Sequence, residues 1–239
     1  MSSPGRETLD RLRQVSTATL TTQLFKRGLR NAFMQNVRPL GPYGGNLVGP
    51  AFTLRNIPAR EDIDSVAVFT DPEHPQRKAI EITPAGHVLV IDCRGDTRAA
   101  CAGQILVTRL MKRGVAGVVT DGGFRDSAEI ARLGIPAYHQ RPSAPTNLTL
   151  HQAIDIDVPI GCGDAPVFPG DTILGDGDGV IVIPASLVDE IAEEAFEMTA
   201  FEDFVAEQVD KGHGIYGLYP PTSEQTMVDF AAWRKMKGR

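Results

Sequence analysis

Cysteine and tryptophan are scarce in this sequence, which has three cysteines and one tryptophan among 239 residues. Cys93, Cys101 and Cys162 are widely spaced, and no Cys-x-x-Cys pair occurs. An odd number of cysteines at such spacing excludes a disulfide framework and a structural zinc site as the leading interpretation. We therefore expect reduced, partly buried thiols.

The sequence also lacks a net positive charge and an apolar run long enough to span a membrane. The chain has 24 Lys and Arg against 30 Asp and Glu, a net charge of −6, and no concentrated basic stretch. Phosphate binding needs such a stretch, so nucleic acid is not expected as the main partner. The polar N-terminus has no signal core, and no apolar window of about 18 residues follows it. We expect a soluble cytoplasmic protein without a membrane partner.

Several catalytic motifs are missing. None of the five histidines stands at HxxxH or HExxH spacing, so zinc is not expected. His139 and His151 are assigned surface or packing roles. No GxSxG motif occurs, and neither Lys78 nor Lys112 lies in an apolar setting that suits a Schiff base. If the chain is an enzyme, this pattern favours metal chemistry over imine chemistry.

Apolar residues make up 42% of the chain, enough for a sizeable core. The apolar runs at 87–93, 115–120 and 135–138 suit strands that are buried on both faces. Between them, 98–113 and 127–133 have helical spacing and end before glycines. The alternation predicts an α/β fold with a parallel βαβαβ core.

The segments before this core are less regular. Residues 29–60 are rich in glycine and proline and predict loops and short strands, with a strand at 51–56. Residues 72–83 fit a polar helix or a loop.

We treat residues 1–239 as a single domain, with N-terminal helices at 6–28 and a core at 45–185. The N-terminal region is predicted as two helices, the second of which begins at Thr17 and is capped by Ser16. After residue 155, short apolar pieces broken by Gly, Pro and Asp predict a β-rich layer or small barrel. The segment 186–239 is predicted to begin with a long amphipathic helix capped by Ser186. Its aromatic tail, which holds Tyr216, Tyr219, Phe230 and Trp233, is expected to pack on other parts of the protein.

The stretch DGGFRD, residues 121–126, follows the predicted strand 115–120 and places Arg125 beside Asp126. Ligands of open parallel sheets sit at the carboxyl ends of strands. The loop RGDTRAACAGQIL follows the preceding strand, so both loops are expected to face one crevice. Two glycines before the charged pair indicate a turn that exposes both side chains.

Gly103 lies in an apolar helical stretch, where glycine costs about 1 kcal/mol relative to alanine. One explanation is that the regular helix starts only near Gly103, so that the free N–H groups of residues 103–106 point at an anion. A glycine that permits close helix packing explains the sequence equally well.

Arg125 and Asp126 carry the chemistry of this candidate site. Arginine offers a planar fork for carboxylate or carbonyl oxygens, and aspartate is a hard oxygen ligand for Mg²⁺. Together they could polarise a 2-keto acid: the metal would chelate the keto and carboxylate oxygens, and the arginine would stabilise the enolate. The structural alternative makes Asp126 a helix N-cap and Arg125 a surface charge.

Five stretches occur in one order with sensible spacing: GNLVGPAFTLR (45–55), AGQIL (102–106), RGVAGVVTDGGFRD (113–126), FPGD (168–171) and DGDGVIVIP (176–184). With these stretches the chain resembles the RraA-like family over roughly residues 15–200. That family includes 4-hydroxy-4-methyl-2-oxoglutarate/4-carboxy-4-hydroxy-2-oxoadipate aldolases. It also includes RraA, an inhibitor of ribonuclease E.

The resemblance implies a swivelling β/β/α domain, assembled as homotrimers or homohexamers with sites between subunits. It implies that Asp126 holds Mg²⁺ or Mn²⁺, partly through water, and that Arg125 contacts the keto oxygen of the substrate. It also implies a loop whose backbone amides bind the carboxylate of pyruvate: Gly103, Gln104, Ile105 and Leu106.

The chain departs from the family pattern at two places. Gln104 stands where the aldolases usually carry an acidic residue, and a neutral amide cannot act as a general acid or base. Thr22-Gln23 stands where the N-terminal helix often has an Asp-Ala pair. The acidic run 189–197 is read as a solvated helix face, or as a source of a carboxylate for the site of a neighbouring subunit.

These observations leave two classes of function open. The first is a divalent-metal lyase of the pyruvate aldolase type that acts on a 2-keto acid, with oxaloacetate decarboxylation as a further activity. The same pocket could dehydrate or hydrolyse a sugar-derived keto acid. The second is a non-catalytic regulator of ribonuclease E. The intact Arg125-Asp126 pair favours the enzyme.

Overall fold

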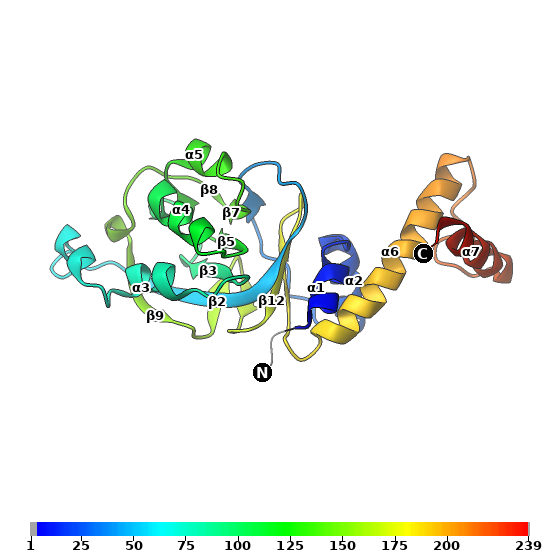
Figure 1. Cartoon of the computed structure of the whole chain (residues 1–239), viewed down its shortest axis with the longest axis horizontal. Helices are drawn as coiled ribbons and strands as arrows, with labels where there is room; N and C mark the ends of the chain where they lie inside the picture. Colours follow the sequence, from blue (N-terminus) through cyan, green and yellow to red (C-terminus); the bar gives the residue numbers. More distant parts are fainter. Residues whose placement is uncertain (1–3, 239) are drawn as a thin grey trace.

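A computed structural model of the chain describes residues 4–238, which form an elongated α/β molecule (Figure 1). The α-helices are α1 (Arg6–Leu12), α2 (Thr17–Lys26), α3 (Pro75–Ile82), α4 (Gln104–Lys112), α5 (Ser127–Ala131), α6 (Val188–Asp210) and α7 (Glu224–Lys237). Two short 3-10 helices are η1 (Val66–Thr70) and η2 (Asn147–Thr149). The strands of the first half are β1 (Arg38–Pro39), β2 (Leu47–Pro58), β3 (Val88–Asp92), β4 (Ala100–Ala102), β5 (Gly117–Thr120), β6 (Gly123–Phe124), β7 (Ala137–His139) and β8 (Arg141–Pro142). Those of the second half are β9 (His151–Ile156), β10 (Ile160–Cys162), β11 (Ala165–Val167), β12 (Thr172–Gly175) and β13 (Val180–Ile183).

An eight-stranded sheet has the order β1-β7-β5-β3-β2-β12-β13, with β9 also paired to β2. The neighbours β2, β3, β5 and β7 run parallel to one another. The predicted parallel βαβαβ core is therefore confirmed, and its strands β3 and β5 lie within the predicted apolar runs. The β-rich segment after residue 155 is also confirmed, as the strands β10 to β13.

The central strands read as continuous apolar runs because both faces of the sheet are covered. In β3, Leu89 and Ile91 pack into the cluster beneath α3, α4 and α5, whereas Val88 and Val90 pack with residues of the later β-strands. Because successive side chains of a strand point to opposite faces, each face of β3 needs its own apolar partners.

The helix expected at 98–113 is wrong in its first part. Residues Ala100–Ala102 form β4, and the helix α4 begins only at Gln104. Alanine favours helices in isolation, but β4 pairs in parallel with β6, and this tertiary pairing overrides the local preference. The start of α4 agrees with the expectation that the regular helix begins near Gly103.

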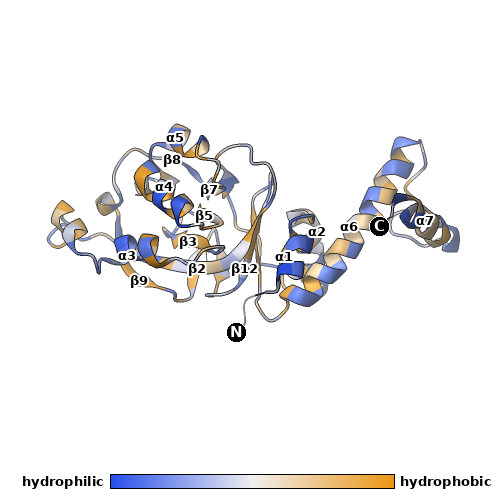
Figure 2. Cartoon of the chain, in the orientation of Figure 1, coloured by the Kyte–Doolittle hydropathy of each residue, from blue (hydrophilic) through white to orange (hydrophobic). Residues whose placement is uncertain are grey.

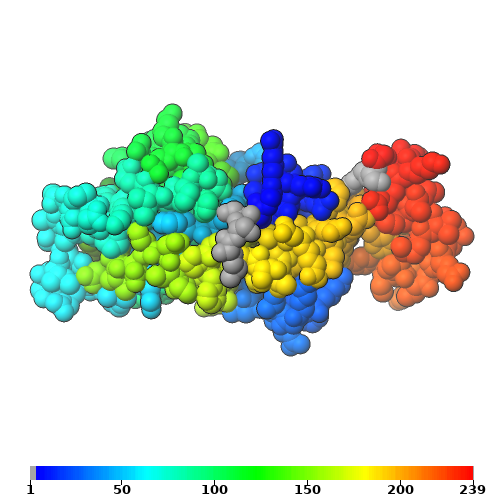
Figure 3. All heavy atoms as spheres, turned by 60° about the horizontal axis from the view of Figure 1, so that its bottom comes forward, coloured from blue at the N-terminus to red at the C-terminus, as the bar shows by residue number. Residues whose placement is uncertain are grey.

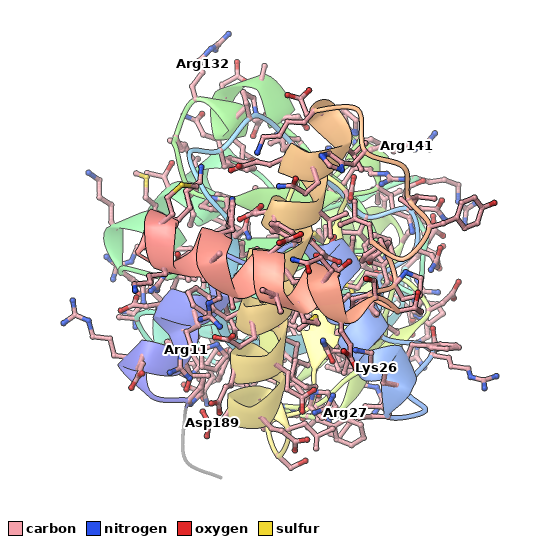
Figure 4. The ribbon with its side chains drawn as sticks, turned by 90° about the vertical axis from the view of Figure 1, so that its right-hand side faces the viewer. Arg11, Lys26, Arg27, Arg132, Arg141 and Asp189 are labelled. Carbon is pink, nitrogen blue, oxygen red and sulfur yellow. The ribbon has the colours of Figure 1, made fainter. Side chains whose placement is uncertain are left out.

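The helix ends agree with the sequence in one case and differ in another. Ser16 caps α2 as predicted, because its hydroxyl accepts a hydrogen bond from the backbone N–H of Thr19 at 3.0 Å. Ser186 does not cap α6, whose N-cap is Leu187 without a side-chain cap. The first turns of α6 are instead tied to α2 by Arg27, which reaches Glu190 at 2.5 Å and Glu194 at 2.9 Å (Figure 4).

The second half of α6 and α7 form an arm at one end of the molecule (Figures 1 and 3). Phe230 and Trp233 of α7 pack against α6 as predicted, and the indole N–H of Trp233 donates to Glu207 at 3.0 Å. The expected packing is wrong for Tyr216, which is 99% exposed, whereas the ring of Tyr219 stacks on Phe201 of α6 with centroids 6.5 Å apart. Figure 2 shows apolar and polar residues intermixed along α6, which packs on the body at one end and on α7 at the other. Within residues 4–238, the length and apolarity required to cross a bilayer are found in no helix.

Candidate functional site

A small parallel sheet brings the two predicted loops together. It has the order β4-β6-β8. The backbone N–H of Arg125 donates to the carbonyl of Ala102 at 3.0 Å, so the residue after β6 is fixed beside the end of β4. Gly103 follows β4 directly, and Asp126 follows Arg125. The predicted crevice between the loops is therefore present.

The two glycines of DGGFRD serve close packing. A Cβ on Gly122 would lie 2.6 Å from the Cβ of Cys93, and one on Gly123 would lie 2.8 Å from the Cβ of Ser143. Neither glycine has a positive φ; the left-handed residue is Asp126, with φ 55° and ψ 39°. The chain bends at Asp121 and Gly122, in agreement with the expected turn, and bends again at Arg125 and Asp126, where Asp126 takes the left-handed conformation.

The first aspartate of the motif, Asp121, supports the scaffold. Its carboxylate accepts hydrogen bonds from the backbone N–H groups of Cys93 at 2.6 Å and Gly95 at 2.8 Å. Burial raises the pKa of Asp121, while these N–H groups favour its charged form. The bonds join the residues that directly follow β3 and β5.

The side chain of Asp126 is directed at α4 and not at α5. One carboxylate oxygen accepts a hydrogen bond from the backbone N–H of Gln104 at 3.2 Å and lies 3.7 Å from the Nε of Arg125. Although Asp126 occupies the N-cap position of α5, it makes no side-chain cap bond there. The geometry therefore gives no support to Asp126 as the cap of α5, the helix that follows it, although its carboxylate does bond the first backbone N–H of α4.

The N-terminus of α4 opens into the same place. Gly103 is the N-cap and has no side chain, so the first-turn N–H groups have no side-chain acceptor from that position. Gly103 has an ordinary extended backbone, with φ −132°. A Cβ there would lie 2.7 Å from the Cγ of Arg125 and 2.8 Å from a carboxylate oxygen of Asp126. The absence of a side chain is what lets both charged groups approach the helix end.

These residues line a cleft of about 240 Å³. Of the predicted site, Gly103, Ile105, Leu106, Arg125 and Asp126 lie on its wall. Gln104 is not among the lining residues; its backbone N–H is bonded to Asp126. The sequence interpretation missed the rest of the polar or aromatic lining, which is formed by Phe69, Gln76, Arg77, Thr146 and Asn147. The only sequence signal for this part of the cleft was the polarity of the segment 72–83, which contains the helix α3.

The donor set fits a weakly held hard cation. Asp126 supplies one carboxylate, whose side chain is 42% exposed, and Gly103 leaves the space beside it free of a Cβ. Within residues 4–238 no group of three or more His, Cys, Asp or Glu is arranged to hold a metal. Mg²⁺ commonly keeps several waters and takes one or two protein carboxylates, whereas zinc needs a fuller set of ligands.

The strand β6, which directly precedes the charged pair, packs against a buried histidine. The ring of His139 stacks on Phe124 with centroids 5.6 Å apart and an interplanar angle of 19°. Burial lowers the pKa of His139 from 6.5 to about 4, so this ring is neutral at physiological pH. The packing role predicted for His139 agrees with this position.

Comparisons with known proteins give one family. The RraA-like model, described as Aldolase/RraA, matches residues 17–182. A protein of Halalkalibacterium halodurans named "Putative 4-hydroxy-4-methyl-2-oxoglutarate aldolase" is 30% identical over 203 residues, 85% of this chain and 89% of its own.

Two solved structures share both fold and sequence with the chain. One is RraAS2 of Streptomyces coelicolor, described as an unusual member of the RNase ES inhibitor RraA protein family. It has a TM-score of 0.74 and 30% identity, over 85% of this chain and 98% of that one. The other, the RNA-processing inhibitor RraA of Thermus thermophilis, has a TM-score of 0.51 and 27% identity over 69% and 92% of the two chains. The chain therefore belongs to the RraA-like family.

Proposed function

We propose that the protein is a divalent-metal-dependent lyase that cleaves a carbon–carbon bond of a 2-keto acid. The observation that carries this proposal is the convergence of three features on one cleft: the guanidinium of Arg125, the carboxylate of Asp126 and the N-terminus of α4. A relative named as an aldolase supports the same class of reaction.

Each feature has a role in such a reaction. The N–H groups at the start of α4 would hold the substrate carboxylate, since a helix N-terminus favours an anion. The guanidinium of Arg125 would donate to the keto oxygen and stabilise the negative charge that develops there. Asp126 would hold the Mg²⁺ or Mn²⁺ ion, which supplies Lewis-acid polarisation of the keto acid.

Proton transfer needs a group from elsewhere. In aldol cleavage the hydroxyl of the substrate loses a proton as the carbon–carbon bond breaks, and the resulting enolate gains one at carbon to give pyruvate. The described residues on the cleft wall include no Glu, His or Lys, and the amide of Gln104 cannot exchange a proton at neutral pH. We propose that water or a neighbouring subunit supplies this base.

The proposal extends to a homo-oligomer that covers the open side of the cleft. Ile105, which lines the cleft, is 82% exposed, and Val66, on the same short helix as Phe69, is 74% exposed. Large apolar side chains gathered beside a polar site are typical of an interface. Light scattering or native mass spectrometry should find a trimer or hexamer at micromolar concentration; a monomer would contradict this part of the proposal.

The primary test measures pyruvate release from oxaloacetate and from 4-hydroxy-4-methyl-2-oxoglutarate. We expect release with Mg²⁺ or Mn²⁺ and none in excess EDTA, with recovery on adding the metal back. Full turnover in chelator would refute the metal dependence. Loss of water from a sugar-derived keto acid, without pyruvate, would assign the dehydratase or hydrolase reaction to the same cleft.

A regulatory role is the second candidate, because the chain is 30% identical to RraAS2 over 85% of its length. In that case the purified protein should slow RNA cleavage by a ribonuclease of the E type at stoichiometric concentration. Asp126→Asn should leave such inhibition unchanged, because protein docking does not depend on a metal ligand in the cleft. Inhibition without keto-acid turnover would favour this candidate over the lyase.

A further inference from the structure

The part of the cleft wall that comes from η1, α3 and η2 carries a second positive group. Arg77 of α3 places its guanidinium carbon 4.1 Å from the centre of the Phe69 ring. Burial lowers the pKa of Arg77, and within residues 4–238 no carboxylate forms an ion pair with it. Arg125, by comparison, stands beside Asp126. A partly buried cation without a counter-ion favours an incoming anion.

Two buried amides stand beside this cation. The side chains of Gln76 and Asn147 line the same cleft and are only 4% and 5% exposed. The amide nitrogen of Gln76 donates to the carbonyl of Cys101 at 2.6 Å, which leaves its oxygen as an acceptor without a partner. The amide nitrogen of Asn147 is likewise a donor without a partner.

The network fixes which amide atom is which. Because a carbonyl only accepts, the atom of Gln76 bonded to Cys101 must be the nitrogen. The oxygen of Asn147 lies 3.5 Å from the hydroxyl of Thr146, which can donate to it. Nearly all buried polar groups in proteins have partners. Seven buried side-chain atoms of residues 4–238 lack one, and these two belong to residues that line the same cleft as Arg77. A ligand that supplies both partners explains them.

We infer that Arg77, Gln76 and Asn147 form a second recognition subsite, for an acidic group at the far end of the keto acid. The inference rests on the proposed function, which places the keto and carboxylate oxygens at Arg125, Asp126 and the start of α4. Arg77 and the Asn147 nitrogen would donate to the distal carboxylate. The Gln76 oxygen would accept from a hydroxyl between the two ends. These three residues would then determine specificity for dianionic over monoanionic keto acids.

Calorimetric titration with two probes tests this subsite in the presence of Mg²⁺. Pyruvate carries only the keto-acid head, whereas 2-oxoglutarate adds a distal carboxylate. We expect the wild type to bind 2-oxoglutarate at least about 10-fold more tightly, the scale of a hydrogen bond to a charged group. Arg77→Met keeps the approximate length of the side chain but removes its charge. This variant should bind 2-oxoglutarate and pyruvate with about equal affinity, and its affinity for pyruvate should equal that of the wild type.

Two further variants separate specificity from general effects. Arg77→Lys retains the charge but not the planar fork, so it should keep part of the preference. Arg132→Met removes an exposed cation outside the cleft and should keep all of it, which controls for net charge. A wild type without preference, or an Arg77→Met variant that keeps it, would overturn the inference. If the preference holds but no metal-dependent pyruvate release occurs, the subsite stands and the proposed reaction fails.

Discussion

The Gly103→Ala variant tests the site geometry with the smallest possible change. The added Cβ would lie 2.7 Å from the Cγ of Arg125 and 2.8 Å from a carboxylate oxygen of Asp126. Ordinary van der Waals contact begins at 3.4 Å. Both groups must therefore retreat by about 0.6 to 0.7 Å, because atoms at such separations repel steeply. The Cγ of Arg125 lies near the backbone and cannot swing away as the end of a long side chain could.

A displacement of this size affects catalysis much more than folding. A misplacement of about 1 Å can cost about 100-fold in rate, so we expect kcat to fall by about 10- to 100-fold. This corresponds to about 1.4 to 2.7 kcal/mol in the activation free energy. The melting temperature should change little, because the backbone of Gly103 is in a region open to alanine.

The assay is metal-dependent pyruvate release, measured beside thermal unfolding. Gly161→Ala is the matched control, since a Cβ at that position meets no heavy atom within 4 Å. It should leave both rate and stability close to those of the wild type. If Gly103→Ala retains full activity while folded, the close approach of the glycine to the charged pair is irrelevant to the reaction, and the assigned site is wrong.

Three further predictions concern the charged pair and its support. Asp126→Asn should lower metal-dependent turnover by orders of magnitude without lowering the melting temperature, because Asp126 makes no cap bond to α5 and the asparagine oxygen can still accept from the Gln104 N–H at the start of α4; a lower melting point with full activity would make it structural. Arg125→Lys keeps the charge but loses the fork, and kcat should fall by about 100-fold, the scale of one oxyanion donor; unchanged kcat would exclude it from the oxyanion role. The native pKa of His139, about 4, lies below its ordinary 6.5, so the unfolded chain binds more protons between these values. The free energy of unfolding should therefore fall as pH drops through that window, by about 2 kcal/mol at pH 5 from this group alone. Thermal melts of His139→Phe, which keeps the stacked ring, should show a shallower pH dependence between 4.5 and 7; an unchanged slope would contradict the assignment.

Local sequence determined the elements whose signals depend on nearby residues. The apolar runs of β3 and β5 are continuous because both faces of each strand are buried, and that requirement is visible in the residues themselves. The Ser16 cap of α2 depends on a hydroxyl three residues from its N–H partner, so it too was predictable. The charged pair of DGGFRD stands in one contiguous stretch, whereas the start of α4 near Gly103 was one of two alternatives that the sequence left open.

Tertiary structure alone decided the features that depend on distant partners. Ala100–Ala102 is a strand only because it pairs with β6, and local propensity would have made it helical. The glycines of DGGFRD are required by Cys93 and Ser143, which are distant from them in the chain, and no turn pattern records such contacts. The wall formed by Gln76, Arg77 and Asn147 brings together α3 and η2, which are far apart in the chain. Its residues are ordinary in composition, and only the fold places a cation and two unpartnered amides in one cleft with the charged pair, because the distance between them is set by packing and not by sequence spacing.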